Sequence, residues 1–146
     1  MKKIILLLMM LNLASAVCWA ENGTYALTVH VADLRNSTGV LQFALYNQDG
    51  TIPDKKYTKY MKKEVAKIIN GSSSITFTDL PKGVYAVNIL HDENSNGKID
   101  KGLLLPIEGI GFSNYSSIGM TNRPNFSDAS FTLDSDMEIE VTVNYL

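Results

Sequence analysis

The sequence predicts a mostly β protein, an antiparallel β-sandwich of six to seven strands, and two observations support this fold class. Over several segments, apolar and polar residues alternate with a period of two, which is the pattern of strands that bury one face. Short turns separate these segments, and the helical connections that parallel strands need are missing. One sandwich domain, residues 21–146, accounts for this length of chain.

Six segments carry the alternation, and in each the apolar side chains share one face. The last is the most regular, with Met137, Ile139 and Val141 on one face and Glu138 on the other. The turn at 79–83 contains a proline and a glycine, which supply the fixed and the permissive dihedral angles of a tight turn. The expected strands are 25–31, 40–46, 75–78, 84–90, 129–133 and 137–145.

The segment 54–69 fits two structures. Its apolar residues recur at helical spacing, which favours a short amphipathic helix near 54–68 lying across the sandwich. Val65, Lys67 and Ile69 fit equally the start of a strand that leads to the following Asn-Gly turn. A solvated face is the ordinary explanation of its lysine run, and a basic patch for an anionic surface or polymer is the functional one. The lysines are Lys55, Lys56, Lys59, Lys62, Lys63 and Lys67.

The first 20 residues have the pattern of a secretory signal peptide. Lys2 and Lys3 precede an apolar run over residues 4–13, and small residues follow. We expect cleavage after Ala20, with Ala16 as the competing position. The apolar run is too short to span a bilayer permanently, which needs about 20 apolar residues. The exported chain is therefore expected in the periplasm or outside the cell, with no transmembrane segment after cleavage.

The chain that remains after cleavage has no thiol, because the only cysteine, Cys18, lies in the leader. Lipidation of Cys18 is a rival interpretation, but Val17 is a poor fit to the small residue such a site needs. Disulfides and cysteine chemistry are therefore not expected. Eleven basic and 15 acidic residues remain, a net charge of −4. This balance argues against nucleic acid as a partner, and we expect an unknown cell-envelope or extracellular ligand.

Residues 91–101, His-Asp-Glu-Asn-Ser-Asn-Gly-Lys-Ile-Asp-Lys, predict a calcium-binding loop from Asp92 to Asp100. Side-chain oxygens recur at alternate positions, then a glycine permits a sharp turn, as in the first nine places of an EF-hand loop. Calcium prefers several hard oxygens at about 2.3–2.6 Å, so alternate residues curl inward around it. The expected ligands are Asp92, Asn94, Asn96, the carbonyl of Lys98, Asp100 and, beyond the loop, Glu108.

The loop departs from an EF-hand at its twelfth place, where Leu103 stands instead of a glutamate. Glu93 or Glu108 is needed to complete the oxygen shell. With so few formal charges we expect weak affinity, with a dissociation constant on the order of 10⁻⁴–10⁻³ M. The alternative is a series of Asx turns that closes the connection without metal, with Gly97 in a left-handed conformation.

A long connection follows, from about Gly102 to Phe126. Long irregular connections in compact domains tend to be functional or to be ordered by something else. Calcium, Glu108 and Arg123 are candidates for that ordering. The alternative is a loop that packs Phe112 and Phe126 into the end of the sandwich, and the two interpretations are compatible.

His91 suggests a catalytic alternative, a periplasmic metal-assisted hydrolase that uses His91, Asp92 and Glu108. A histidine at a strand end is more commonly hydrogen-bonded to a neighbour, and no known nucleophile or zinc motif is present. Asp92 and Glu93 are adjacent, so on a regular strand they point to opposite faces and make no ready acid/base pair.

Four runs carry a resemblance to a known family: 77–87, the loop 91–100, Pro106-x-Glu108-Gly109-x-Gly111-Phe112-Ser113-Asn114, and Pro124-x-Phe126-x-x-Ala129. Together they resemble the bacterial family catalogued as domain of unknown function 2141, over nearly all of residues 21–146. The family consists of exported proteins with no established activity, so the resemblance implies fold and export and supplies no catalytic residue. Its Leu-Pro-x-Gly-x-Tyr turn is similar to that of transthyretin-like sandwiches, which implies a transthyretin-like or immunoglobulin-like fold.

Three functions are therefore carried forward. The first is an exported, non-enzymatic β-sandwich module that binds calcium through the loop from Asp92 to Asp100. The second is the hydrolase centred on His91. The third is a cell-envelope surface-binding protein that uses the lysine-rich segment 55–67, and its binding should weaken with added salt.

Overall fold

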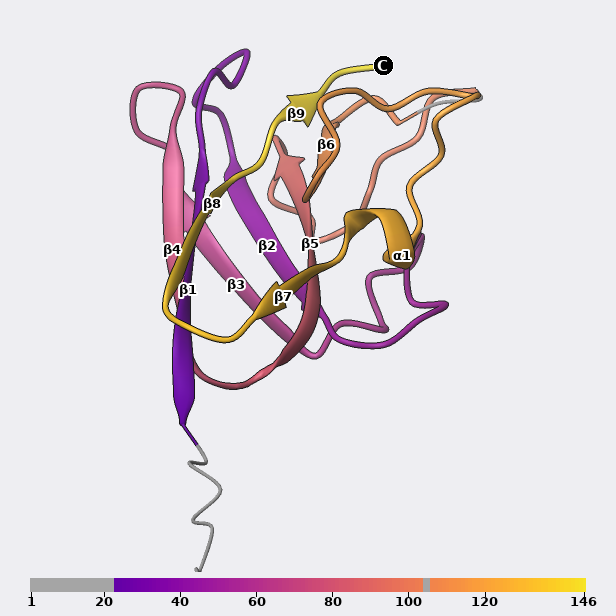
Figure 1. The fold of residues 1–146 in the computed structure, drawn as a ribbon. Helices are drawn as coiled ribbons and strands as arrows, with labels where there is room; N and C mark the ends of the chain where they lie inside the picture. Colours follow the sequence, from indigo (N-terminus) through magenta and orange to yellow (C-terminus); the bar gives the residue numbers. More distant parts are fainter. Residues whose placement is uncertain (1–22, 104–105) are drawn as a thin grey trace, which may run out of the picture.

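Two β-sheets face each other and enclose the main core (Figure 1). The computed structural model describes residues 23–103 and 106–146, so the predicted signal peptide, residues 1–20, lies outside the described residues. The elements are β1 (Thr24–Val31), β2 (Val40–Tyr46), β3 (Lys62–Lys67), β4 (Ser73–Pro81), β5 (Gly83–Asp92), β6 (Gly109–Phe112), α1 (Phe126–Ala129), β7 (Phe131–Leu133), β8 (Met137–Glu140) and β9 (Val143–Asn144).

The smaller sheet has the order β4-β1-β8, and the larger has the order β3-β2-β5-β6-β9, with β7 pairing with the first part of β5. All strand pairs in the described residues are antiparallel except β1 with β8, which run parallel. Only one helix, of four residues, occurs among the described elements. The predicted mostly β sandwich is confirmed.

The C-terminal run predicted as one strand, 137–145, belongs to both sheets. Met137–Glu140 pairs with β1, and Val143–Asn144 pairs with β6 in the opposite sheet. Val141 lies between them, is buried in the core, and its N–H donates to the carbonyl of His30 at 2.9 Å. The alternation therefore continues without a break while the chain crosses from one sheet to the other.

The helix considered near 54–68 is not formed, and the alternative strand is correct. Lys62–Lys67 is β3, which pairs with Val40–Leu45 of β2 at the edge of the larger sheet. The residues before it form turns, because the Asp54 carboxylate accepts the N–H groups of Thr58 and Lys59 at 2.8 and 2.6 Å. Tyr57 has a φ of 51°, which a right-handed helix excludes.

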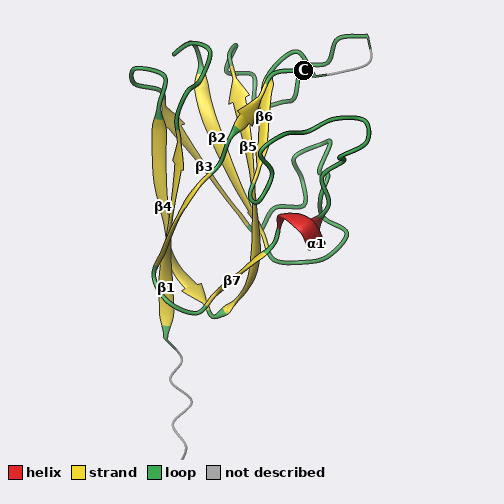
Figure 2. Cartoon of the chain, turned by 45° about the horizontal axis from the view of Figure 1, so that its top comes forward, coloured by secondary structure: helices red, strands yellow, loops and turns green. Residues whose placement is uncertain are grey.

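A second core covers the outer face of the larger sheet. β2 and β5 are buried on both faces, so their sequences are apolar nearly throughout. Connections cover this outer face beside β5 and β6 (Figure 2). The second core consists of Ala44, Tyr46, Ile52, Tyr57, Ala86, Leu90, Ile110, Phe112, Tyr115, Phe126 and Ala129. One interpretation of the connection from Gly102 to Phe126 packs Phe112 and Phe126 into the end of the sandwich. Both residues belong to this second core, on the outer face of the larger sheet.

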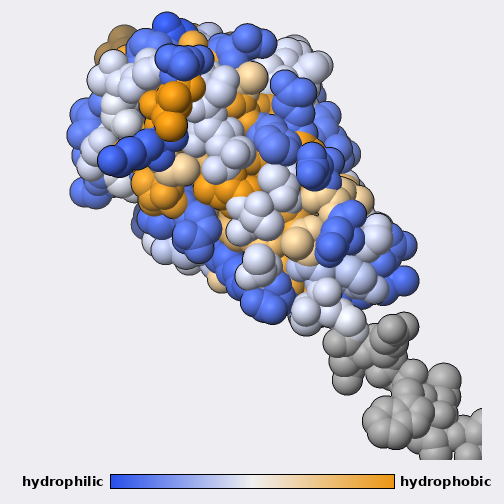
Figure 3. All heavy atoms as spheres, turned by 90° about the vertical axis from the view of Figure 1, so that its left-hand side faces the viewer, coloured by the Kyte–Doolittle hydropathy of each residue, from blue (hydrophilic) through white to orange (hydrophobic). Residues whose placement is uncertain are grey.

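The opposite side of the molecule, where the edge strand β4 lies, shows apolar surface between polar side chains (Figure 3). The end of β3 approaches β4 there, before the turn at Asn70 and Gly71. Val65 is 52% exposed and Ile69 is 70% exposed. β3 also contains Lys62, Lys63 and Lys67, and lysines on an edge strand oppose pairing with another chain.

No helix in the part of the chain that the structure describes is long and apolar enough to cross a membrane.

The close approach of β6 and the C-terminal segment gives a first prediction. A Cβ atom at Gly111 would lie 2.4 Å from the Thr142 carbonyl oxygen, whereas at Gly119 nothing lies within 4 Å. We expect Gly111→Ala to lower the free energy of unfolding by about 2–3 kcal/mol, because backbone must shift to admit the methyl group. Gly119→Ala should change it by less than about 0.5 kcal/mol. Urea unfolding measures both, and equal effects would contradict this packing.

Candidate metal-binding loop

The Asn/Gly-rich loop begins at the last residue of β5. Val40 of β2 is still paired with Asp92, so the sheet fixes the point at which the loop starts. Ser95 and Gly97 have φ values of 58° and 76°, and these left-handed residues turn the chain back within five positions. The Ser95 N–H donates to the Asp92 carbonyl at 3.3 Å.

The carboxylate of Asp92 organises this turn. Its side chain is 1% exposed. Oδ1 accepts the Asn96 N–H at 3.0 Å, and Oδ2 accepts the Gly97 N–H and the Gln42 Nε2 group, both at 2.7 Å. Three donors therefore hold one buried carboxylate, which is the condition under which burial of a charge is tolerated.

Three of the predicted ligands, Asn94, Asn96 and Asp100, contact one another beyond Asp92. Asn94 Nδ2 and Asn96 Nδ2 both donate to Asp100 Oδ2, the latter at 2.9 Å. The Oδ1 atoms of the two asparagines accept N–H groups of Asn96 and Lys98 at 3.0 and 2.8 Å. The loop thus contains the Asx turns that the metal-free interpretation predicts, and it also brings together three of the expected ligands, Asn94, Asn96 and Asp100, through the amide nitrogens of the asparagines.

Glu108, predicted from outside the loop, lies against both of its ends. It is 4% exposed, and its Oε1 and Oε2 accept the N–H groups of Glu93 and Asp100 at 3.0 and 3.1 Å. Burial raises the pKa of Glu108, two backbone N–H groups oppose this rise, and the nearby charges of Asp92 and Asp100 add to it. Three carboxylates therefore share one end of the molecule.

Glu93, the other glutamate considered for the oxygen shell, is bound elsewhere. Arg35 Nε donates to its Oε1 at 2.9 Å, Arg35 Nη2 donates to its Oε2, and Asn36 Nδ2 donates to its Oε1 at 2.6 Å. The Arg35 guanidinium also lies 4.5 Å from the centre of the Tyr145 ring. The hydrogen bond from Arg35, with help from Asn36, lowers the pKa of Glu93 from 4.5 to about 2.

His91 is on the opposite face of β5 from Asp92, because neighbouring residues of a strand point to opposite sides. It is fully buried, and its Nε2 donates to the Thr38 carbonyl at 2.9 Å. Its Nδ1 lies 2.7 Å from the Tyr145 hydroxyl, and the two rings meet edge to face. The structure therefore brings Asp92 and Glu108 together and does not bring His91 to them.

The charge balance at the loop is unusual. The ion pairs in residues 23–103 and 106–146 are His30 with Glu138 and Arg35 with Glu93. Asp92, Asp100 and Glu108 thus have no cationic side chain within ion-pair distance among the described residues. In the same residues, no three His, Cys, Asp or Glu side chains are arranged to hold a metal. A metal here would need amide and carbonyl oxygens in addition to carboxylates, and such a mixed set of oxygens suits calcium.

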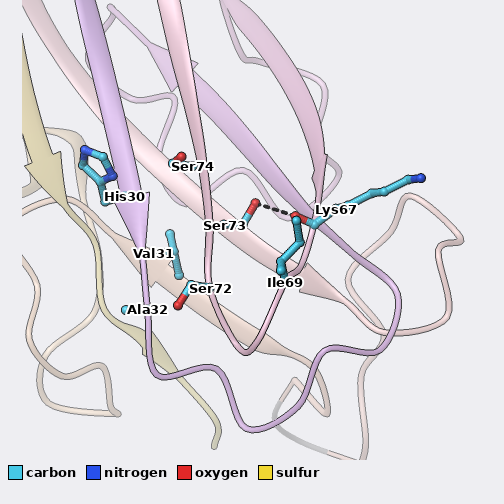
Figure 4. Close-up of a pocket in the computed structure, with 8 residues that line it drawn as sticks. All are labelled: His30, Val31, Ala32, Lys67, Ile69, Ser72, Ser73 and Ser74. Atoms are coloured by element: carbon cyan, nitrogen blue, oxygen red, sulfur yellow. Dashed lines mark hydrogen bonds between the residues drawn. The ribbon is translucent and has the colours of Figure 1, made fainter.

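A separate hollow of about 440 Å³ lies between β1 and the turn that joins β3 to β4 (Figure 4). Ser72, Ser73 and Ser74 line it together with His30 and Ile69, and the Ser73 hydroxyl donates to the Lys67 carbonyl at 2.9 Å. None of the predicted calcium ligands contributes to its lining. It is therefore distinct from the candidate site.

Sequence reasoning missed two partners of the loop, Gln42 and Arg35. Both are distant in sequence, by 50 residues from Asp92 and 58 residues from Glu93. Gln42 carried one signal, a polar residue inside the apolar run of β2. Arg35 carried none, because it lies in a connection and only the pairing of β2 with β5 brings that connection to the loop.

The fold and loop define a class, a small β-sandwich with an Asx-rich loop after a central strand. The family model described as an uncharacterized protein conserved in bacteria, domain of unknown function 2141, matches residues 29–141. The chain belongs to this family, as its motifs predicted. Neither the curated proteins nor the solved structures contain a significant match.

The Arg35–Glu93 pair gives a prediction of pH dependence. Because the pKa of Glu93 falls from 4.5 to about 2 on folding, its stabilisation is present above pH 4.5 and is lost as the pH falls toward 2. We expect Glu93→Gln to reduce the acid-dependent loss of unfolding free energy by about 1 kcal/mol, allowing for solvent screening. Urea unfolding at pH 6, 4 and 2.5 measures this. Glu64→Gln, at an exposed position of β3, is the control and should leave the profile unchanged.

Proposed function

We propose that this protein is an exported, non-enzymatic β-sandwich module that binds calcium weakly through the loop from Asp92 to Asp100. Export, to the periplasm or outside the cell, is supported by the leader-like residues 1–20 of a chain from a bacterial family. The observation that carries the calcium proposal is the convergence of Asn94 and Asn96 on Asp100, beside two buried carboxylates that lack a cationic partner.

The chemistry of the donor set supports a hard cation. Carboxylate and amide oxygens each have two acceptor positions, so the backbone hydrogen bonds that fix these side chains do not exhaust their capacity. Asp92, Asn94, Asn96, Asp100 and Glu108 supply side-chain oxygens, and Lys98 supplies a carbonyl. Bound calcium would supply the positive charge that these carboxylates lack.

A buried acceptor beside the loop supports the same proposal. Gln42 donates its Nε2 group to Asp92, and among the described residues its Oε1 atom is buried without a hydrogen-bond partner. Buried acceptors in folded proteins are normally satisfied by a protein group, an ordered water or an ion. An unsatisfied oxygen next to a buried carboxylate favours a bound cation or a water on it.

The hydrolase alternative has less support. A general base must reach the proton that it removes, directly or through one water. His91 is buried on the other face of β5, with Thr38 and Tyr145 at its two ring nitrogens. The carboxylates of Asp92 and Glu108 have no imidazole beside them, so the geometry favours a binding role over hydrolysis.

The surface-binding alternative needs the lysines of segment 55–67 to act together, and their contacts differ. Lys59 donates to the Gly50 carbonyl at 3.2 Å, and Lys62 donates to the Thr78 carbonyl at 2.8 Å. Lys63 stacks on Tyr60 with its Nζ 5.4 Å from the ring centre. Of the lysines in this segment, Lys55 and Lys56 line a hollow together, whereas the contacts of Lys59, Lys62 and Lys63 lie elsewhere. A broad basic patch therefore has less support than the calcium loop.

Thermal melts with calcium, magnesium and chelator test the calcium proposal. Calcium about a hundredfold above its dissociation constant should raise the unfolding free energy by about 2.7 kcal/mol. Magnesium should raise it less, because it demands stricter octahedral geometry and gives up its water reluctantly. The absence of a calcium-specific shift at millimolar concentration would favour the metal-free Asx turns.

Two matched variants locate the effect. Asp100→Asn keeps the shape of a converging ligand and removes its charge, so it should lose most of the calcium-dependent shift. Asp134→Asn makes the same change at an exposed position distant from the loop and should keep the shift. Each variant is compared with itself in chelator, which separates calcium binding from any change in intrinsic stability. An unchanged shift in Asp100→Asn would place calcium elsewhere.

A further inference from the structure

Three connections enclose a hollow on the outer face of the larger sheet. Its volume is about 250 Å³, and it adjoins a second hollow of about 430 Å³ with which it shares Lys55, Ile99 and Lys101. The walls come from the connection between β2 and β3, from the connection between β5 and β6, and from Pro124 before α1. Segments far apart in the sequence thus build one cleft.

The floor of the cleft is apolar with one buried amide. Ile110 and Phe112 of β6 are 9% and 4% exposed, and Asn88 of β5 is 4% exposed. The Tyr57 hydroxyl donates to Asn88 Oδ1. Among the described residues no hydrogen bond occupies Asn88 Nδ2, which leaves a donor on a residue that lines the cleft. A small apolar pocket with a few polar groups is the usual form of a ligand site.

The mouth of the cleft is cationic. Lys55, Lys56, Lys98 and Lys101 line the second hollow with Ile99, and no acidic residue lines it. None of these lysines forms an ion pair among the described residues. Four like charges around one hollow repel one another, and a bound anion relieves that repulsion.

Asp54, the acidic residue in the lining of the smaller hollow, does not neutralise these lysines. It is 6% exposed, and its Oδ2 accepts the N–H groups of Thr58 and Lys59 and the Tyr46 hydroxyl. Its charge is therefore held by the turn that it closes. The lysines keep their charge for a ligand.

We propose that this cleft binds a compact amphiphilic anion, a small molecule with an apolar ring or short chain and a carboxylate or phosphate group. The apolar part occupies the hollow over Ile110 and Phe112, and the anionic group lies among Lys55, Lys98 and Lys101. A volume below the range of about 300–1,000 Å³ for drug-sized ligands limits the apolar part to a single ring or short chain. This proposal goes beyond calcium binding and does not require it.

The test uses three probes on the purified protein in chelator, followed by amide chemical shifts in NMR. Phenyl phosphate carries both features of the ligand, inorganic phosphate only the anion, and benzyl alcohol only the ring. We expect phenyl phosphate to shift the amides of Asn88, Ile110 and Phe112 and to bind at least tenfold more tightly than either other probe. Added salt should weaken this binding, because exposed charges are screened.

Variants assign the binding to the cleft. Lys101→Gln should weaken phenyl phosphate binding several-fold, and Lys55→Gln should do the same from the opposite wall. Lys82→Gln removes a charge at an exposed turn outside the cleft and should change nothing. Equal binding of phenyl and inorganic phosphate, or equal loss in all three variants, would overturn the proposal. Because calcium is absent throughout, failure here leaves the calcium proposal standing, and the reverse also holds.

Discussion

The buried carboxylate of Asp92 is the interaction on which this end of the molecule depends. A charge that is 1% exposed needs several donors, and it receives them from the Gln42 side chain and from the backbone of Asn96 and Gly97. The bond from Gln42 ties the loop to β2, and the bonds from the Asn96 and Gly97 N–H groups turn the chain back on itself. The same contacts thus end β5, shape the loop and set the direction in which residues 98–101 leave it.

The second core explains why the site lies where it does. An antiparallel sheet can leave one face in water, but here connections cover the outer face of β2, β5 and β6 with apolar side chains. Asn88 and Asp92 face this layer, so both are polar groups in an apolar setting. Asn88 accepts a hydrogen bond from Tyr57, and Asp92 accepts bonds from Asn96 and Gly97 in addition to Gln42 of β2. Residues of the connections are therefore parts of the candidate loop and cleft as well as a cover over the second core.

The sequence predicted the elements whose pattern is local and missed those decided by distant contacts. The bounds of β2 were predicted because Leu41, Phe43 and Leu45 share one face at a spacing of two residues after the break at Gly39. The helix near 54–68 was wrong because Tyr57 is apolar at helical spacing yet has a positive φ in a turn closed by Asp54. The proposed ligands within the loop follow from spacing, whereas the Arg35 partner of Glu93 depends on strand pairing.

The alternation of side chains between the two faces of β5 decides which chemistry the site supports. His91 and Asp92 are adjacent, so one side chain must enter the core between the sheets when the other enters the outer layer. Burial of His91 against Thr38 and Tyr145 therefore directs Asp92 toward Gln42 and the loop. The outer layer then contains carboxylates, amides and lysines without an imidazole. Oxygens suit a hard cation and ammonium groups suit an anion, so the two proposed ligands, calcium and an anion, would both bind to the segment that contains Ile99.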